Sequence, residues 1–132
     1  MVPAGSTVGV VNGLQDTLDM LRVVLEGSGF QVVDAQARDI RHGVVDLAEF
    51  VHRHGVRVIV YDVAIPYLEN WQALEGWRSA PALARIPFII TTTNARALDS
   101  IVGKTGAFEI IGTPYDLELV VDAVRRAAGV RD

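Results

Sequence analysis

The feature that most constrains this chain is a pattern that repeats along it. A short β-branched run is followed by a turn rich in Gly, Asn or Pro, and then by a stretch with apolar residues at helical spacing. Such alternation predicts a parallel sheet covered by helices on both faces. We expect five strands, over residues 7–12, 30–35, 56–62, 86–92 and 107–111.

Five stretches between and after these strands are predicted to be helices, because their apolar residues fall on one helical face. The first holds Leu14, Leu18, Leu21 and Leu25, the second Val44, Leu47 or Ala48 and Val51, the third Leu68, Trp71, Leu74 and Trp77, the fourth runs from the cap Asn94 to Val102, and the last holds Leu117, Val120, Val121, Val124 and Ala128. Right-handed crossovers between parallel strands then favour a doubly wound α/β sheet of order 2-1-3-4-5, the flavodoxin-like three-layer sandwich.

The length of the chain suits one domain. It has 132 residues, half of them apolar, and such a chain can bury a single substantial core. No linker or low-complexity segment interrupts the pattern. We therefore expect one domain over residues 7–130, after a disordered lead-in over residues 1–6.

Composition excludes several classes of partner. The formal net charge is -4, from 16 acidic and 12 basic residues that are interspersed, so no basic cluster is present to neutralise a nucleic acid backbone. There is no Cys, which excludes disulfides and thiolate metal sites and suits a reducing cytosol. The apolar runs are far shorter than the roughly 20 residues that a membrane-spanning helix needs. We expect a cytoplasmic protein that binds neither nucleic acid nor membranes.

Ligands of doubly wound sheets gather beyond the carboxyl ends of the central strands. In this chain those ends are predicted to carry Asn12 and Gly13, residues 62–64, residues 91–94 and residues 112–114. The turn after the first strand has no Gly-rich dinucleotide fingerprint, which argues against a Rossmann cofactor site.

Three of the segments at these ends carry a family resemblance. Residues 58–66 read Val-Ile-Val-Tyr-Asp-Val-Ala-Ile-Pro, residues 85–93 read Arg-Ile-Pro-Phe-Ile-Ile-Thr-Thr-Thr, and residues 106–116 read Gly-Ala-Phe-Glu-Ile-Ile-Gly-Thr-Pro-Tyr-Asp. In this order and at this spacing, the chain resembles the CheY-like receiver domains of two-component response regulators, over essentially its whole length. The resemblance implies that Asp62 stands at the phosphoacceptor position and Thr92 at the position whose hydroxyl meets the phosphoryl group.

The chain departs from the family pattern in the pocket itself. Asn12 and Gly13 stand where the family carries a pair of acidic residues that hold Mg²⁺. Thr113, which precedes Pro114, stands where the family has Lys. Thr93 occupies a position where the family commonly has a smaller residue, and we expect it to narrow access to the pocket.

These departures weaken both metal binding and phosphoryl transfer. Mg²⁺ usually needs one or two carboxylates besides substrate oxygens, and here only Asp62, the amide oxygen of Asn12 and the backbone carbonyl of Ala64 would remain as ligands. A charged hydrogen bond is worth about 1.5–3 kcal/mol, against roughly 1 kcal/mol for the neutral bond that Thr113 would supply. We therefore expect no resident cofactor, with weak Mg²⁺ binding at most, and weak or absent phosphorylation.

The resulting prediction is an atypical receiver domain that works mainly by protein–protein interaction and is not an enzyme. The resemblance implies a signalling partner such as a sensor kinase or a downstream effector, or a second copy of the chain. It places the interface on the fourth helix, the fifth strand and the fifth helix, with the candidate contacts Ala97, Ile101, Phe108, Ile110, Tyr115 and Glu118. Ile110 also stands where the family carries the aromatic residue of its switch.

Two alternatives stay open. One is a functional single-domain receiver that is phosphorylated on Asp62 and uses Asn12 and Asp16 near the metal position. The other is a flavodoxin-like domain that binds a small molecule in the same crevice.

Other residues that invite a functional interpretation have a simpler one. We expect His42, His52 and His54 to be solvated, because their spacing does not place them on one side of a helix with a carboxylate partner. We expect Trp71 and Trp77 to be packing residues, and an exposed Trp71 would instead indicate an interface. The isomer of the Thr113–Pro114 bond does not follow from the sequence.

Overall fold

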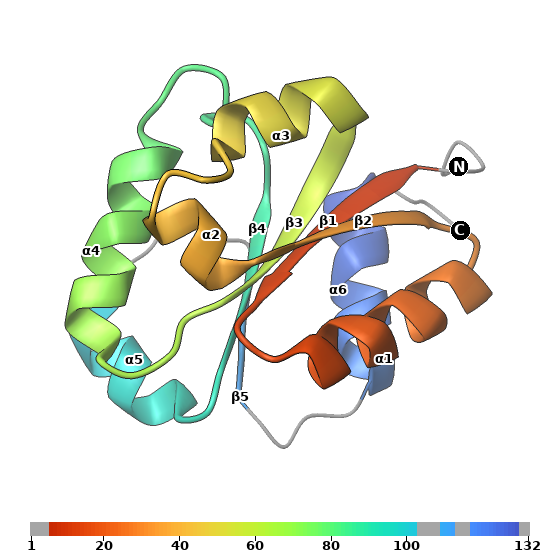
Figure 1. Ribbon diagram of the computed structural model, residues 1–132. Coiled ribbons are helices and arrows are strands. Elements are labelled where there is room, and N and C mark those ends of the chain that lie inside the picture. Colours follow the sequence, from red (N-terminus) through yellow and green to blue (C-terminus); the bar gives the residue numbers. More distant parts are fainter. Residues whose placement is uncertain (1–5, 103–108, 113–116, 130–132) are drawn as a thin grey trace.

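A computed structural model describes residues 6–102, 109–112 and 117–129. Its sheet is parallel and has the strand order β2-β1-β3-β4-β5, which confirms the predicted doubly wound topology (Figure 1). The strands are β1 (Thr7–Asn12), β2 (Gln31–Gln36), β3 (Val56–Asp62), β4 (Phe88–Thr92) and β5 (Glu109–Gly112).

Six helices cover the two faces of this sheet in the described residues. They are α1 (Gln15–Gly27), α2 (Ala37–Arg41), α3 (Leu47–His54), α4 (Tyr67–Arg78), α5 (Ala95–Val102) and α6 (Leu117–Ala127). Helices α1 and α6 lie on one face and the other four helices on the opposite face, so the expected three layers are present (Figure 1).

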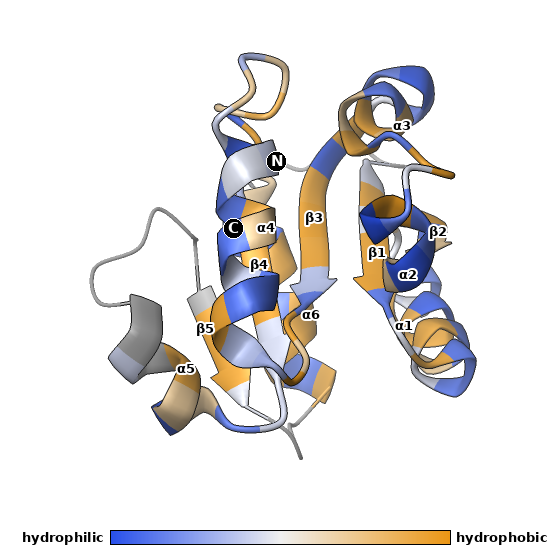
Figure 2. Cartoon of the chain, turned by 60° about the vertical axis from the view of Figure 1, so that its left-hand side comes forward, coloured by the Kyte–Doolittle hydropathy of each residue, from blue (hydrophilic) through white to orange (hydrophobic). Residues whose placement is uncertain are grey.

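Each face of the sheet has its own apolar core. Under α1 and α6, side chains such as Leu21 and Val124 pack on Val10 and Val60 of the strands. Under the other helices, Leu74 packs in a second cluster with the alternate strand residues. Figure 2 shows the consequence, since β1 and β3 are hydrophobic along most of their length, while α1 and α3 carry both hydrophobic and hydrophilic residues. No helix in the described ranges is long and apolar enough to cross a membrane.

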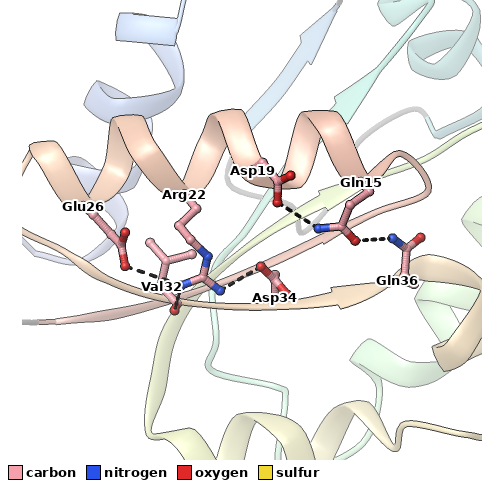
Figure 3. Close-up of polar contacts among 7 residues, drawn as sticks. All are labelled: Gln15, Asp19, Arg22, Glu26, Val32, Asp34 and Gln36. Atoms are coloured by element: carbon pink, nitrogen blue, oxygen red, sulfur yellow. Dashed lines mark hydrogen bonds and ion pairs between the residues drawn. The ribbon is translucent and has the colours of Figure 1, made fainter.

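Polar contacts tie α1 to β2, one of the two edge strands of the described sheet (Figure 3). The guanidinium of Arg22 donates to the carbonyl of Val32 at 2.8 Å and to the carboxylate of Asp34 at 2.7 Å. At the other end of the strand, the amide of Gln36 donates to the side-chain oxygen of Gln15 at 2.9 Å. These bonds hold α1 against β2 at both ends of the strand.

Several apolar residues lie elsewhere than their spacing predicted. Leu14, Val44 and Leu68 are 66%, 74% and 51% exposed, so they do not belong to the buried helical faces assigned to them. Leu14 is extended and precedes α1, and Val44 precedes α3, which begins at Leu47. Apolar residues next to a helix can continue its spacing pattern without continuing the helix itself, which is the physical reason for the error at Leu14 and Val44. Leu68 lies in the first turn of α4, on its exposed side.

Element boundaries also differ in places. Strand β4 begins at Phe88 rather than at residue 86, since Pro87 has no N–H to donate to the ladder. The short helix α2 was not expected, because five residues are too few to show a helical repeat. Ser6 is buried and its carbonyl accepts a bond from the backbone of Gln31, so it belongs to the fold rather than to a disordered lead-in.

The Trp and His residues take the simpler roles. Trp71 is buried in the core beneath α4, and Trp77 packs against Tyr61, so both are packing residues and Trp71 is not an interface residue. All three His residues are exposed, and the described residues contain no cluster of three or more His, Asp or Glu side chains placed to hold a metal ion.

Candidate functional site

The carboxyl ends of three strands bring the predicted site residues together. Val11 of β1 pairs with Tyr61 of β3, so the next residues along, Asn12 and Asp62, are neighbours at the edge of the sheet. Asp62 pairs in turn with Thr91 of β4. The connections that follow these three strands all leave from the same end of the sheet (Figure 1).

Asp62 is partly buried and has one neutral partner. Its Oδ1 accepts a hydrogen bond from the hydroxyl of Thr91 at 2.8 Å. Burial raises the pKa of the Asp62 carboxyl, and the bond from Thr91 opposes that rise by stabilising the ionised form. No Lys, Arg or His in the described part of the chain forms an ion pair with it.

The hydroxyl that contacts Asp62 therefore comes from Thr91. The resemblance assigns contact with a phosphoryl group to Thr92, and that assignment stays a prediction. Strand alternation explains the contact from Thr91. Asp62 follows Val60 on the face of the sheet covered by α1 and α6, and Thr91 follows Ile89 on that same face. Thr92 is fully buried, and its hydroxyl accepts a long bond of 3.5 Å from the backbone N–H of Asn94.

The two other candidate oxygen ligands are already hydrogen-bonded within the chain. The side-chain oxygen of Asn12, a residue that is 5% exposed, accepts the backbone N–H of Leu14 at 2.9 Å. The carbonyl oxygen of Ala64 accepts the side-chain amide of Asn70 at 2.8 Å. One carboxylate and two neutral oxygens that already have donors are a poor set of ligands for Mg²⁺.

Gly13 leaves a space beside these residues. It is exposed, and a Cβ atom built on it would have no neighbour within 4 Å. The position that the family fills with an acid is thus open to a side chain.

A second contact joins the two connections beside Asp62. The hydroxyls of Tyr67 and Thr93 lie 2.6 Å apart and share a hydrogen bond, although the two residues belong to different connections, after β3 and after β4. Tyr67 is the residue that sequence reasoning missed here, because nothing in its local pattern distinguishes it from an ordinary helix-start residue.

The remaining predicted residues are distributed more widely. Thr113 and Pro114 of the pocket, and Phe108 and Tyr115 of the interface, lie outside the described residues, as does the Thr113–Pro114 bond. Ala97 lies partly buried on α5, Ile101 belongs to the same helix, Ile110 packs against the core on β5, and Glu118 is exposed on α6.

Comparison with solved structures decides the fold. The chemotaxis protein CheY4 of Vibrio cholerae superposes with a TM-score of 0.72 at 18% identity, over 94% of this chain and 99% of that one. A response regulator of Thermotoga maritima gives 0.73 at 20% identity, over 95% and 98%. The chain has the CheY-like receiver fold.

Another structure with this fold is the receiver domain of the sensor histidine kinase PA1611 of Pseudomonas aeruginosa, described with a magnesium ion coordinated in its active-site cleft. It superposes with a TM-score of 0.74 at 20% identity, over 96% of this chain and 99% of that one.

No family model matches the sequence. A probable transcriptional regulator, ycf29 of Porphyra purpurea, is 25% identical over 88 residues. That match covers 66% of this chain, which spans less than half (42%) of the relative.

Proposed function

We propose that this chain is a receiver-type signalling domain that acts by binding another protein, and that it does not depend on Mg²⁺-assisted phosphorylation of Asp62. One observation carries the proposal. Of the four oxygens available to a metal ion, three accept a hydrogen bond from within the chain: Oδ1 of Asn12, Oδ1 of Asp62 and the carbonyl oxygen of Ala64.

Those hydrogen bonds make coordination of a metal ion less favourable. To coordinate Mg²⁺, Asn12 and Ala64 would have to share or release their donors, at a cost of about 1 kcal/mol for each neutral bond. Asp62 would have to act in its ionised form, which burial disfavours. The surrounding hydrogen bonds therefore oppose Mg²⁺ binding at this end of the sheet, and only one carboxylate, that of Asp62, is available to offset their cost.

Phosphoryl transfer faces a second obstacle. The protein's part in such reactions is mainly to position the phosphoryl group and to neutralise its charge. The sequence offers Thr113 where the family has Lys, so a charged partner is replaced by a neutral hydroxyl. Together with the missing acids at Asn12 and Gly13, this leaves an incoming dianion without a strong counter-charge.

The test is direct phosphorylation of the purified chain. We expect that incubation with Mg²⁺ and acetyl phosphate leaves the intact mass unchanged. A phosphate-sized gain that is absent from the Asp62→Ala variant would refute the proposal. The same incubation of an active receiver domain is the positive control for the donor.

One observation favours a second candidate, a receiver that is phosphorylated despite its altered pocket. Asp62 keeps its place at the strand end and has a hydroxyl beside it, from Thr91. Asp16, exposed in the first turn of α1, would then have to complete the metal site. Millimolar Mg²⁺ that shifts the amide signals of residues near Asp62 would support this candidate.

The partner we propose is a signalling protein such as a sensor kinase or a downstream effector, with a second copy of the chain as the alternative. Binding of a small molecule in the strand-end crevice also stays a prediction, which a thermal-shift screen tests.

A further inference from the structure

A pocket lies between the segment that joins α2 to α3 and the end of α4. It is lined by parts of residues 40–48 and 76–83, and we call it the α3–α4 pocket. Figure 2 shows α4 on one side of this region and α2 and α3 on the other, with β3 between them. None of the residues found in its lining belongs to a strand, and none is among the site residues around Asp62. The α3–α4 pocket is therefore a separate place in the fold.

The α3–α4 pocket has an apolar floor and an open rim. Its floor consists of buried apolar side chains, which are Ile40, Leu47 and Leu83. Its walls consist of partly buried residues, which are Val45, Ala48, Trp77 and Ala80. Its rim consists of exposed residues, which are Gly43, Asp46 and Gly76. A concave, mostly apolar site of this kind is the usual form of a small-molecule site.

A glycine in α4 keeps one side of the α3–α4 pocket open. Gly76 lies two residues before the end of α4, and its φ is not positive, so other residues could adopt its backbone conformation. A Cβ atom built on it would have no neighbour within 4 Å. Glycine destabilises a helix relative to alanine. The missing side chain of Gly76 thus relieves no steric conflict with the described residues, and its effect is to leave space in the pocket.

Trp77 supplies an aromatic surface beside that space. Its ring is partly buried and lies 6.3 Å from the ring of Tyr61, at an angle of 51°. Tyr61 is itself buried and packs on Phe88 at 6.4 Å. These contacts hold the Trp77 ring in place while part of it stays accessible. A ring that is fixed before binding is suited to pack against a flat aromatic ligand.

The lining offers little to a charged ligand. Asp46 is the one ionisable residue found in it, and Oδ1 of Asp46 already accepts the backbone N–H of Glu49 at 3.1 Å. The basic residues next to the lining in the sequence, Arg41, His42 and Arg78, are not part of it. A charge that is buried without a partner is costly. An acidic ligand would therefore enter the α3–α4 pocket without a counter-charge.

The volume of the α3–α4 pocket sets the size of its ligand. It is about 330 Å³, at the small end of the range for ligand pockets. An apolar cavity of about 150 Å³ is enough to hold benzene. The α3–α4 pocket has about twice that volume, which suits a ligand of two fused rings.

We propose that the α3–α4 pocket binds an uncharged, planar aromatic molecule of about two fused rings. Its apolar floor, the accessible ring of Trp77 and the space beside Gly76 carry this inference. The inference goes beyond the proposed function and does not depend on it, because the pocket shares no residue with the site around Asp62.

Indole is the probe, because it is an uncharged aromatic molecule of two fused rings. Titrated without label into the isotopically labelled chain, it is expected to shift the amide signals of residues 43–48 and 76–83. The side-chain N–H signal of Trp77 is expected to move with them. The side-chain N–H signal of Trp71 is the internal control and should move much less, since Trp71 is buried and does not line the pocket. We expect a Kd below about 1 mM.

Two comparison ligands test the chemical class. Cyclooctanol has as many non-hydrogen atoms as indole but no aromatic ring, and it is expected to bind at least about twofold more weakly, the lower end of what an aromatic pair contributes. Indole-3-acetate keeps the ring and adds a carboxylate. It is expected to bind at least about threefold more weakly, because its charge has no partner in the lining.

Variants that fill the pocket test the residues. Gly76→Leu is expected to weaken indole binding at least about tenfold, and Gly76→Ala to weaken it less. The matched control is Gly27→Leu, since Gly27 is also an exposed helical glycine with no neighbour within 4 Å of a built Cβ, and it does not line the pocket. That control is expected to bind indole within about twofold of the parent chain.

Urea unfolding separates a filled pocket from a damaged fold. Both Gly76 variants are expected to unfold at a urea concentration at least as high as the parent chain, because each replaces glycine within a helix. Weaker binding together with an undiminished midpoint would support the proposal.

Several outcomes would overturn the proposal. They are no shift of the Trp77 signals up to the solubility limit of indole, unchanged binding to Gly76→Leu, or an equal loss of binding in Gly27→Leu. Cyclooctanol or indole-3-acetate binding as tightly as indole would also overturn it, because the proposed chemical class would then be wrong.

Discussion

Restoring the two missing acids is a quantitative test of what the pocket lacks. We consider the double variant Asn12→Asp with Gly13→Asp. Asn12 neighbours Asp62 on the adjacent strand, and Gly13 has open space for a side chain. Neighbouring strands lie about 4.8 Å apart, so two carboxylates would be roughly 5 Å apart; at an effective dielectric constant of about 20 they repel by roughly 3 kcal/mol. The variant should be less stable than the parent by about 2–3 kcal/mol without a metal ion, allowing for solvent screening at the exposed end.

Mg²⁺ should reverse that loss in the double variant alone. A ligand at about 100 times its dissociation constant stabilises the folded state by roughly 2.7 kcal/mol. Urea unfolding with and without Mg²⁺, at matched ionic strength, measures the difference. We expect a gain of about 2–3 kcal/mol for the variant and less than about 0.5 kcal/mol for the parent. An equal gain in the parent chain would refute the reasoning, because it would show a competent metal site already present.

Three further predictions concern named side chains. Burial raises the folded-state pKa of Asp62 above its ordinary value of 3.8. The free energy of unfolding therefore falls as the pH rises from 3.8 to the folded pKa, and Asp62 lowers it by nothing in more acidic solution. Asp62→Asn should therefore be more stable than the parent at neutral pH and equal to it in acid, while the exposed Asp16→Asn should show no such pH-dependent gain in urea unfolding. Arg22→Ala removes two charge-assisted bonds between α1 and β2 and should cost about 1–2 kcal/mol, discounted for partial exposure; a chemical-denaturation midpoint equal to the parent's would contradict this. Thr91→Val should raise the pKa of Asp62, measured by carbon NMR of its carboxyl group, and Thr92→Val should not. The reverse result would show that the hydroxyl of Thr92, and not that of Thr91, stabilises the ionised carboxylate.

Much of the fold could be predicted because its signals are local. The predicted bounds of the strands over residues 7–12 and 56–62 match β1 and β3. Buried strands read as β-branched runs, and each run here ends at a polar residue or a turn. The N-cap of α5 was also predicted, since the side chain of Asn94 accepts the backbone N–H of Ala97 at 3.0 Å.

The sequence is less informative where an interaction joins elements that are distant in sequence. The choice between Thr91 and Thr92 depends on how β4 pairs with β3, and the alternation of Val60, Asp62, Ile89 and Thr91 was the available signal. Likewise, the candidate metal-ligand oxygens are occupied by hydrogen bonds such as that from Asn70 to Ala64. Nothing in the sequence around these two residues indicates that they are in contact.

Beryllofluoride binding is the measurement that tests the central claim most directly, because this complex imitates a phosphoryl group on a carboxylate and needs a divalent cation beside it. With Mg²⁺ and beryllofluoride added to the chain, we predict that fluorine NMR shows only the free species. A protein-bound fluorine signal that disappears in Asp62→Ala would contradict the account, since it would mean that Asp62 accepts a phosphoryl-like group in spite of its neighbours.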